Sequence, residues 1–291
     1  MKLALNWKDY EIVDCSNGEK LERWGNFYLL RPDPQIIWDN GDLLKKYSKM
    51  IHAHYIRSNK GGGHWENLRS IKESWKIEYK NLTFCIKQMG FKHTGLFPEQ
   101  ACNWDYFIEK IKQSKREIKV LNLFAYTGGA SVACLFAGAS VVHVDSSRGM
   151  VDWAKENVNA SGLKDAKVRY IVDDVVKFVN REIRRGNKYD AIIMDPPSYG
   201  RGNNGEVWDF EKDLFPLLKL CKEILSDDPL FLHINSYTTG MSKEVLENIL
   251  KILFKDKNAL ITSSEIGLPV SNSEVVLPCG MYGRIEWSET K

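Results

Sequence analysis

The sequence predicts an α/β protein, built as a doubly wound and mostly parallel sheet of seven strands with a small β-rich domain before it. From Ile118 onward, short β-branched segments alternate with segments of helical periodicity. Strands that are separated by helices pair in parallel through right-handed crossovers. Before residue 93, by contrast, β-branched and aromatic residues cluster between turn signals. We therefore expect two domains, at residues 1–93 and 94–291.

The β-rich domain is expected to be a small sheet. Its strands are predicted at 10–14, 26–31, 35–38 and within 75–89, where the sequence reads YEIVD, NFYLLR, QIIW and WKIEYKNLTFCIKQM. Gly61 to Gly63 interrupt this pattern in NKGGGHWEN, residues 59–67, and favour a flexible surface linker. The alternative for these glycines, which stand between basic and aromatic neighbours, is a loop that follows a phosphate backbone.

The second domain is expected to begin with a helix at 102–116, where Trp104, Phe107, Ile108 and Ile111 recur at helical spacing. Seven strands follow, with helices between most of them. Because no clear helix separates the last two strands, we expect these two to form a closing antiparallel hairpin. The strands are predicted near 119–124, 140–145, 167–172, 189–194, 229–235, 259–266 and 276–286.

A nucleotide-type cofactor site is predicted by residues 120–147, which read as strand, glycine turn, helix, strand and acidic residue. The turn AYTGGA at 125–130 places backbone amides at a helix N-terminus, where the positive end of the helix dipole meets a carboxylate or phosphate. Asp145 lies 17 residues after Gly128 and is placed to accept hydrogen bonds from ribose hydroxyls. The alternative for Asp145 is a loop carboxylate or helix cap before Arg148. The spacing does not match G-x-G-x-x-G, so a dinucleotide is disfavoured.

Polar residues stand at the carboxyl ends of five predicted strands. In a doubly wound sheet the ligand lies beyond these ends, where the strand order reverses. We therefore expect one polar rim, formed by Asn122 to Ser131, Asp145, Asp173 and Asp174, Asp195 to Tyr199, and Asn235 to Tyr237.

The segment Asp195-Pro196-Pro197-Ser198-Tyr199 directly follows the apolar strand YDAIIMD, and with the glycine turn it points to methyl transfer. Here the sequence resembles the class I S-adenosylmethionine-dependent methyltransferases, and within them the ribosomal RNA large-subunit methyltransferase family. The resemblance spans about residues 82 to 291 and rests on LNLFAYTGG, VDSSRGMVDWAKENVNASG, YIVDDVVKFV and DAIIMDPPSYG. TGLFPEQACNW is similar to that family's segment before the catalytic domain, although Ala101 replaces the arginine often found there.

The resemblance implies S-adenosyl-L-methionine as the cofactor. Asp174 is expected to bind the adenine amino group while Asp173 caps the following helix, and Asn157 is expected to hold loops together. The residues expected to bind the cofactor are Asn122, Phe124, Ala125, Tyr126, Thr127, Gly128, Ala130, Ser131, Asp145, Ser146, Asp173, Asp174 and Asp195. Those expected to be catalytic are Asp195, Pro196, Pro197 and Tyr199.

Methyl transfer from a sulfonium is an in-line displacement, so the enzyme must mainly align the nucleophile and exclude water. Asp195, with the Pro196 carbonyl, is expected to accept hydrogen bonds from a base, while Tyr199 offers a stacking face. The glycine-rich segment 198–210 has the composition of a mobile lid over an extruded base. Within it, Arg201 is expected to meet a phosphate, and Trp208 either stacks on the substrate or packs. Asn235 is a further substrate-binding candidate.

The predicted reaction is methylation of a base nitrogen, with guanine favoured. Methylation of cytosine carbon 5 needs a cysteine thiolate. In the resembled cytosine enzymes that cysteine follows the strand after Asp-Pro-Pro, where this chain reads LHINSYTTGM. Cys279 is expected to be structural. The alternatives are cytosine C5 chemistry with a displaced cysteine, a non-catalytic RNA-binding module, and a small-molecule methyltransferase.

Charge and composition favour an RNA partner, with ribosomal RNA expected. Residues 1–93 carry 16 Lys and Arg against 11 Asp and Glu, a net +5, whereas residues 94–291 carry 25 against 27, a net −2. A basic first domain suits RNA docking, although a solvated basic surface explains the same numbers.

The six cysteines lack C-x-x-C spacing, so no metal is expected. Without a signal peptide or an apolar run of about 18 residues, a cytoplasmic enzyme with no membrane contact is expected. The sequence predicts no oligomeric state.

Overall fold

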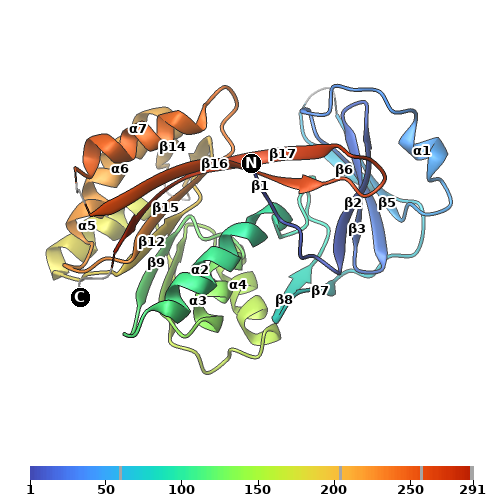
Figure 1. Cartoon of the computed structure of the whole chain (residues 1–291). Helices are drawn as coiled ribbons and strands as arrows, with labels where there is room; N and C mark the ends of the chain where they lie inside the picture. The colour runs from blue at the N-terminus through green and yellow to red at the C-terminus, as the bar shows by residue number, and fades with distance from the viewer. Residues whose placement is uncertain (59–60, 203–204, 256–257, 289–291) are drawn as a thin grey trace. The chain divides into compact units, whose positions relative to one another are not determined.

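The computed structural model describes residues 1–58, 61–202, 205–255 and 258–288 (Figure 1). The chain divides into two compact units. The first, here called the α/β unit, contains Met1–Lys2, Asn103–Ile266 and Gly280–Lys291. The second, here called the β unit, contains Leu3–Cys102 and Gly267–Cys279. The domain boundary expected after residue 93 stays a prediction.

The predicted doubly wound, mostly parallel sheet is confirmed. Its strands lie in the order β1 (Lys2–Leu3), β16 (Ala259–Pro269), β17 (Val276–Trp287), β15 (Phe231–Ser236), β12 (Ala191–Met194), β9 (Lys119–Leu123), β10 (Ser140–Asp145) and β11 (Val168–Val172). The five strands from β15 to β11 are parallel, and β17 runs antiparallel to β15. The short strand β1 makes the sheet eight-stranded, whereas seven were expected, because two residues carry no readable strand pattern.

Helices cover both faces of this sheet (Figure 1). On one face lie α2 (Ala101–Gln113), α3 (Gly129–Phe136) and α4 (Arg148–Ala160), and on the other lie α5 (Val175–Arg185), α6 (Phe210–Glu223) and α7 (Lys243–Leu253). Strand residues point alternately to the two faces. Leu121 and Leu123 of β9 therefore join the core under α5, α6 and α7, whereas Phe231 of β15 stacks on Phe107 of α2.

The β unit holds a five-stranded sheet in the order β2 (Tyr10–Ser16), β3 (Glu19–Trp24), β4 (Phe27–Pro32), β5 (Ala53–Arg57) and β6 (Gly63–Asn67). A hairpin of β7 (Trp75–Tyr79) and β8 (Leu82–Ile86), the short helix α1 (Leu43–Lys46) and a 3₁₀ turn at Pro98–Gln100 complete it. The expected small sheet is thus present.

The prediction of a strand at 35–38 is wrong, because the structure describes these residues and has no strand there. Pro34 has no backbone N–H, and the Asp33 carboxylate accepts a hydrogen bond from the Gln35 N–H at 3.2 Å, which makes a turn there. Ile36 is buried, but Ile37 is 90% exposed. Apolar composition alone suggested a strand, and the local turn chemistry prevented one.

The Gly61 to Gly63 segment lies at the turn between the paired strands β5 and β6, where Gly61 and Gly62 are exposed. Gly63 pairs with Arg57, and a Cβ on Gly63 would come within 2.3 Å of the Ile56 carbonyl oxygen. Close backbone approach therefore requires glycine at this position. Residues 59 and 60 of the same sequence segment lie outside the described residues.

Candidate active site

The glycine turn after β9 has an unusual backbone conformation. Gly128 is the N-cap of α3 with a φ of +82°, and a Cβ there would lie 2.9 Å from the Ala154 Cβ. Phe124 and Tyr126 also adopt left-handed φ values, 51° and 50°, which cost energy for residues with side chains. Such conformations persist where surrounding contacts hold them, and they cluster at functional sites. The turn is therefore a preformed feature of this fold.

Asp145, at the carboxyl end of β10, helps to hold that turn. Its Oδ2 accepts a hydrogen bond from the Tyr126 N–H and its Oδ1 accepts one from the Ser147 N–H, each at 2.8 Å. Burial raises the pKa of Asp145, in opposition to these two hydrogen bonds. Each carboxylate oxygen accepts more than one hydrogen bond. The structure therefore gives Asp145 the loop-holding role that was the alternative, and leaves acceptor capacity for a ribose.

Two of the predicted cofactor-binding residues lie beneath the turn. The Asn122 Nδ2 donates to the Ser131 Oγ at 2.9 Å, and the Ser131 Oγ contacts the His143 Nδ1 at the same distance. All three side chains are buried, and burial lowers the pKa of His143 to about 3, so its ring is neutral. This arrangement supports the turn from within. Sequence reasoning missed His143, because its pattern is that of an ordinary strand residue.

Asn157 lies on α4 and holds the turn from another side. Its Nδ2 donates a hydrogen bond to the Thr127 carbonyl oxygen at 2.8 Å, and both residues are buried. The predicted loop-holding role of Asn157 is confirmed.

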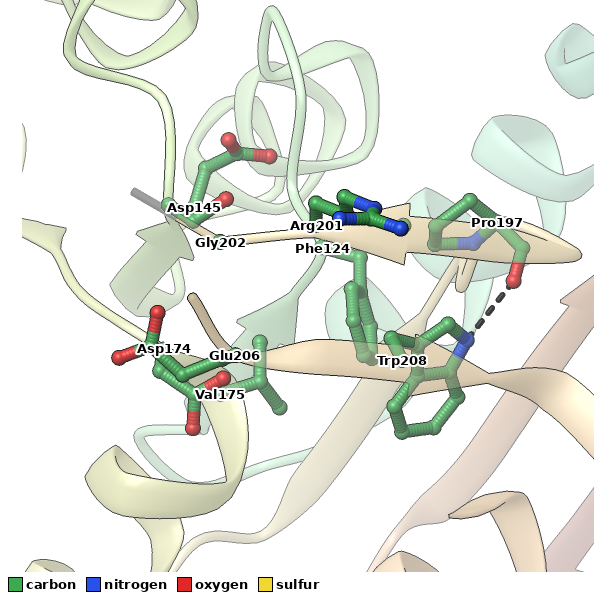
Figure 2. Close-up of a pocket in the computed structure, with 11 residues that line it drawn as sticks. Phe124, Asp145, Asp174, Val175, Pro197, Arg201, Gly202, Glu206 and Trp208 are labelled. Carbon is green, nitrogen blue, oxygen red and sulfur yellow. Dashed lines mark hydrogen bonds between the residues drawn. The ribbon is translucent and has the colours of Figure 1, made fainter. Parts of the chain in front are cut away.

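A pocket opens beside the turn, at the carboxyl ends of β9, β10 and β12 (Figure 2). The carboxylates of Asp145, Asp174 and Glu206 lie on one side of it, and the rings of Phe124 and Trp208 lie on the other. Seven predicted site residues line it, alongside four that were not predicted. The lining residues are Phe124, Asp145, Ser146, Asp174, Val175, Pro197, Gly200, Arg201, Gly202, Glu206 and Trp208.

The predicted roles of Asp173 and Asp174 need a correction, because Asp174 is the N-cap of α5. The Asp174 Oδ1 accepts a hydrogen bond from the Lys177 N–H at 2.8 Å. Asp173, the expected cap, instead pairs with Arg181, and its Oδ1 accepts from the Asp174 N–H at 2.9 Å. Either of two adjacent carboxylates can begin a helix by sequence, and only the backbone conformation decides which one does. Asp174 still lines the pocket.

The Asp195 segment continues from β12 into a short hairpin of β13 (Tyr199–Arg201) and β14 (Val207–Asp209). Trp208 is 8% exposed, lies 4.7 Å from the Phe124 ring, and donates its indole N–H to the Pro197 carbonyl oxygen at 2.7 Å. Of the two alternatives for Trp208, the structure therefore shows packing. Tyr199 is exposed, as a stacking face requires. Residues 203 and 204 of the predicted lid lie outside the described residues.

Sequence reasoning missed Glu206 and Val175 in this pocket. Glu206 forms an ion pair with Lys177 of α5 at 2.5 Å, which ties the hairpin to that helix. Val175 directly follows Asp174, so its position in the sequence was a usable signal. Glu206 lies 31 residues beyond Val175, and no local signal brings the two together.

The cysteines and possible metal ligands give no sign of a further centre. All six thiols are free of disulfides. Among the residues that the structure describes, no cluster of three or more His, Cys, Asp or Glu side chains is arranged to hold a metal ion. None of the described helices is long and apolar enough to span a membrane.

The fold and the pocket define an α/β enzyme that binds a nucleotide-type cofactor at the carboxyl ends of parallel strands. Residues 45–248 match the family model of S-adenosylmethionine-dependent methyltransferases. The chain belongs to this family, and S-adenosylmethionine is its cofactor. The predicted fold, enzyme class and cofactor are thereby confirmed.

Solved structures agree with this assignment. A methyltransferase from Agrobacterium tumefaciens, described as dependent on S-adenosylmethionine, is 33% identical with a TM-score of 0.92, over 98% of this chain and 92% of that chain. The protein SMU.776, crystallised with S-adenosylhomocysteine, shares the fold with a TM-score of 0.76 at 20% identity, over 97% of this chain and 76% of its own.

Curated relatives show similarity to ribosomal RNA large-subunit methyltransferases in particular. A ribosomal RNA large subunit methyltransferase K/L from Syntrophotalea carbinolica is 28% identical over 183 residues, which are 62% of this chain and 25% of that protein. The predicted resemblance to that family is confirmed. The chain spans less than a third of the length of five of the ribosomal RNA methyltransferases that it matches.

The pocket suits the cofactor of this family in three respects. Asp145 has acceptor oxygens of the kind that ribose hydroxyls need, the Phe124 and Val175 side chains offer apolar surface to a ring, and Asp174 adds a further carboxylate acceptor to the lining. The turn at 125–130 leads into the N-terminus of α3, which favours a carboxylate such as that of the methionine moiety. These residues would hold the cofactor, which supplies an electrophilic methyl group.

Proposed function

We propose that the chain methylates RNA, most specifically a base nitrogen of ribosomal RNA with guanine favoured. The observation that carries the proposal is the Asp195-Pro196-Pro197 segment, which follows β12 directly beside the cofactor pocket. The names of the curated relatives support ribosomal RNA as the substrate. Cytoplasmic localisation accompanies this proposal as an expectation from the sequence.

The chemistry asks the protein to orient a base and exclude water. The methyl group leaves the cofactor sulfur as the base nitrogen attacks from the opposite side, and the sulfur keeps the electron pair of the broken bond. Asp195 accepts hydrogen bonds from the base edge, and the exposed Tyr199 ring stacks on the base. Arg201, also exposed, meets a phosphate of the RNA.

Nitrogen chemistry is favoured over cytosine C5 chemistry. The strand β15 ends in Asn235 and Ser236, and residues 232–241 contain no cysteine. Burial raises the pKa of the Cys279 thiol well above its usual value, with Glu99 nearby adding to the effect. A thiol with a raised pKa is a poor nucleophile, because the thiolate is the reactive form. Guanine N7 already carries an in-plane lone pair and needs no covalent activation.

The test is methyl transfer from radiolabelled S-adenosylmethionine to bulk ribosomal RNA isolated from a deletion strain, followed by mass spectrometry of the nucleosides. We expect labelled RNA that contains a methylated guanine missing from the deletion strain. Label in 5-methylcytosine would favour the cytosine alternative. Tight RNA binding without label would favour a non-catalytic module, and label only in small molecules would exclude RNA as the substrate.

A further inference from the structure

A buried polar network lies behind Asn235 in the α/β unit. The His233 Nε2 is 2.9 Å from the Asn235 Oδ1, and the Asn103 Nδ2 donates to the same oxygen at 3.2 Å. Arg284 of β17 donates from Nε to the His233 Nδ1 and from a terminal nitrogen to the Asn103 Oδ1, each at 3.1 Å. Tyr106 lies against this guanidinium, 3.3 Å from its ring centroid to the Arg284 Cζ.

The arginine sets the direction of every hydrogen bond in this network. Arg284 only donates, so the His233 Nδ1 must accept. Burial and the neighbouring Arg284 charge lower the pKa of His233 well below its usual value, so the ring is neutral and its one N–H is on Nε2. Asn103 must likewise present its oxygen to Arg284 and its amino group to Asn235. Both partners of Asn235 are therefore donors.

Two donors on one side fix the orientation of the Asn235 amide. Its oxygen must point inward to accept both hydrogen bonds. A flipped amide would place its NH₂ group against two N–H donors and leave them unsatisfied in a buried site. All four side chains are buried, with Asn103 at 1%, His233 at 0%, Asn235 at 3% and Arg284 at 7% exposure. The NH₂ group of Asn235 is then the part left for a ligand.

Asn235 lies level with the polar rim in the strand register. Met194 of β12 pairs with Ile234 of β15, so the next residues on these parallel strands are Asp195 and Asn235. An acceptor, Asp195, thus follows the end of β12, and a donor, Asn235, stands beside it in β15, one residue before that strand ends. A base edge that carries a hydrogen-bond donor beside an acceptor matches this pair, as the N1–H and O6 on the Watson–Crick edge of an unpaired guanine do.

We propose that Arg284, acting through His233 and Asn103, is a positioning residue that holds Asn235 as a donor-only contact for the target base. Asn235 then donates to a base acceptor that lies beside the base donor bound by Asp195. This proposal rests on the proposed function, because it concerns how the same site reads its RNA substrate.

The most direct test is Asn235→Asp, which keeps an inward oxygen and replaces the NH₂ donor by a charged acceptor. We expect kcat/KM for ribosomal RNA to fall at least 100-fold, with S-adenosylhomocysteine affinity and melting temperature close to wild type. His233→Gln preserves both polarities, since its oxygen accepts from Arg284 and its NH₂ donates to Asn235, so most activity should remain. His233→Leu removes both the acceptor for Arg284 and the donor to Asn235, so its turnover should be at least tenfold below that of His233→Gln.

Two measurements separate positioning from a merely structural role. Nitrogen-15 NMR of the wild-type protein without RNA should show His233 as the neutral Nε2–H form between pH 6 and 8. Tyr106→Phe removes the hydroxyl that donates to Glu286 at 2.8 Å but keeps the ring under Arg284, so turnover should be unchanged.

The outcomes distinguish the two proposals. Wild-type turnover in Asn235→Asp, equal turnover in the two His233 variants, or an Nδ1–H form of His233 would overturn the positioning role. A wild-type protein that methylates no RNA, while His233 shows the Nε2–H form, would instead count against the proposed function.

Discussion

We propose that Asp145 combines a structural and a ligand-binding role in one carboxylate. It holds the backbone of Tyr126 and Ser147 and also lines the pocket. We predict that Asp145→Ala weakens S-adenosylmethionine binding by about 1.5 to 3 kcal/mol, the usual cost of losing a hydrogen bond to a charged group. Calorimetry measures this loss, with Asp152→Ala on the exposed face of α4 as the control. Unchanged affinity in Asp145→Ala would contradict a ribose-binding role.

Substitutions of Asp195 and of Cys279 distinguish the two chemistries. We predict that Asp195→Ala loses far more in turnover than in cofactor affinity, because its oxygen orients the base and not the cofactor. Cys279→Ser should keep activity within about tenfold, roughly 1.4 kcal/mol of barrier. Single-turnover kinetics with labelled cofactor measures both. A covalent adduct between the wild-type protein and RNA containing 5-fluorocytosine would reverse this assignment.

At the scale of elements, the turn from β9 into α3 depends on Gly128. A side chain there meets both an unfavourable φ of +82° and the Ala154 Cβ at 2.9 Å. We predict that Gly128→Ala lowers stability by at least about 1 kcal/mol and weakens cofactor binding. Gly162→Ala is the matched control, since its φ is +72° but nothing lies within 4 Å of the added Cβ. Chemical denaturation and calorimetry together should show a binding defect for Gly128→Ala alone.

In the β unit, Glu22 ties three strands together. It accepts hydrogen bonds from Arg31 on β4 at 2.5 Å and from the Tyr10 hydroxyl on β2 at 2.7 Å. Burial acts to raise the pKa of Glu22, but Arg31 and Lys20 outweigh it and lower that pKa to about 2. A carboxylate with a lowered pKa stabilises the fold above its unfolded pKa, near 4.5, and loses that contribution as the pH falls toward 2.

We therefore predict that Glu22→Gln lowers the free energy of unfolding by about 3 to 5 kcal/mol at pH 7, because Arg31 is left without its buried partner. The difference from wild type should shrink between pH 4.5 and about 2, since the wild-type carboxylate becomes protonated there. Urea denaturation at several pH values checks this. Glu11→Gln is the control, because its pair with Arg23 is partly exposed and is worth at most about 1 kcal/mol. A pH-independent difference would contradict the assigned pKa.

At the scale of the whole molecule, the predicted RNA contact is electrostatic. RNA affinity should fall linearly with salt on logarithmic axes, with a slope set by the number of phosphates contacted. The β unit includes residues 267–279, so deleting an N-terminal segment would not remove it cleanly. Replacing the exposed lysines Lys72, Lys76 and Lys80 by Gln tests it better.

We predict that this triple variant lowers the magnitude of the salt slope by about 1 to 2, while the same change at Lys115, Lys164 and Lys219 of the α/β unit leaves it within error. Fluorescence anisotropy with a ribosomal RNA fragment from 50 to 300 mM salt measures both. Equal slopes for the two variants and wild type would mean that the basic charge of the β unit serves another purpose.

By itself the sequence determined the order of strands and helices in the α/β unit, the glycine turn and the acidic strand ends. It also determined the family, through the turn and the Asp195-Pro196-Pro197 segment. These features are local, because hydrophobic period, turn residues and short motifs each act within about a dozen neighbouring residues. Asn157 was predicted correctly for its loop-holding role because the family resemblance covers that helix.

Only the tertiary structure decided which of two adjacent aspartates caps α5, that Trp208 packs on Phe124, and that Glu206 reaches the pocket. It also brought Arg284 to His233, 51 residues earlier in the chain, and to Asn103, 181 residues earlier. Hydrogen-bond polarity in a buried network depends on which donors and acceptors meet in space. No sequence pattern within one segment predicts these long-range contacts, so the orientation of Asn235 follows from the fold alone.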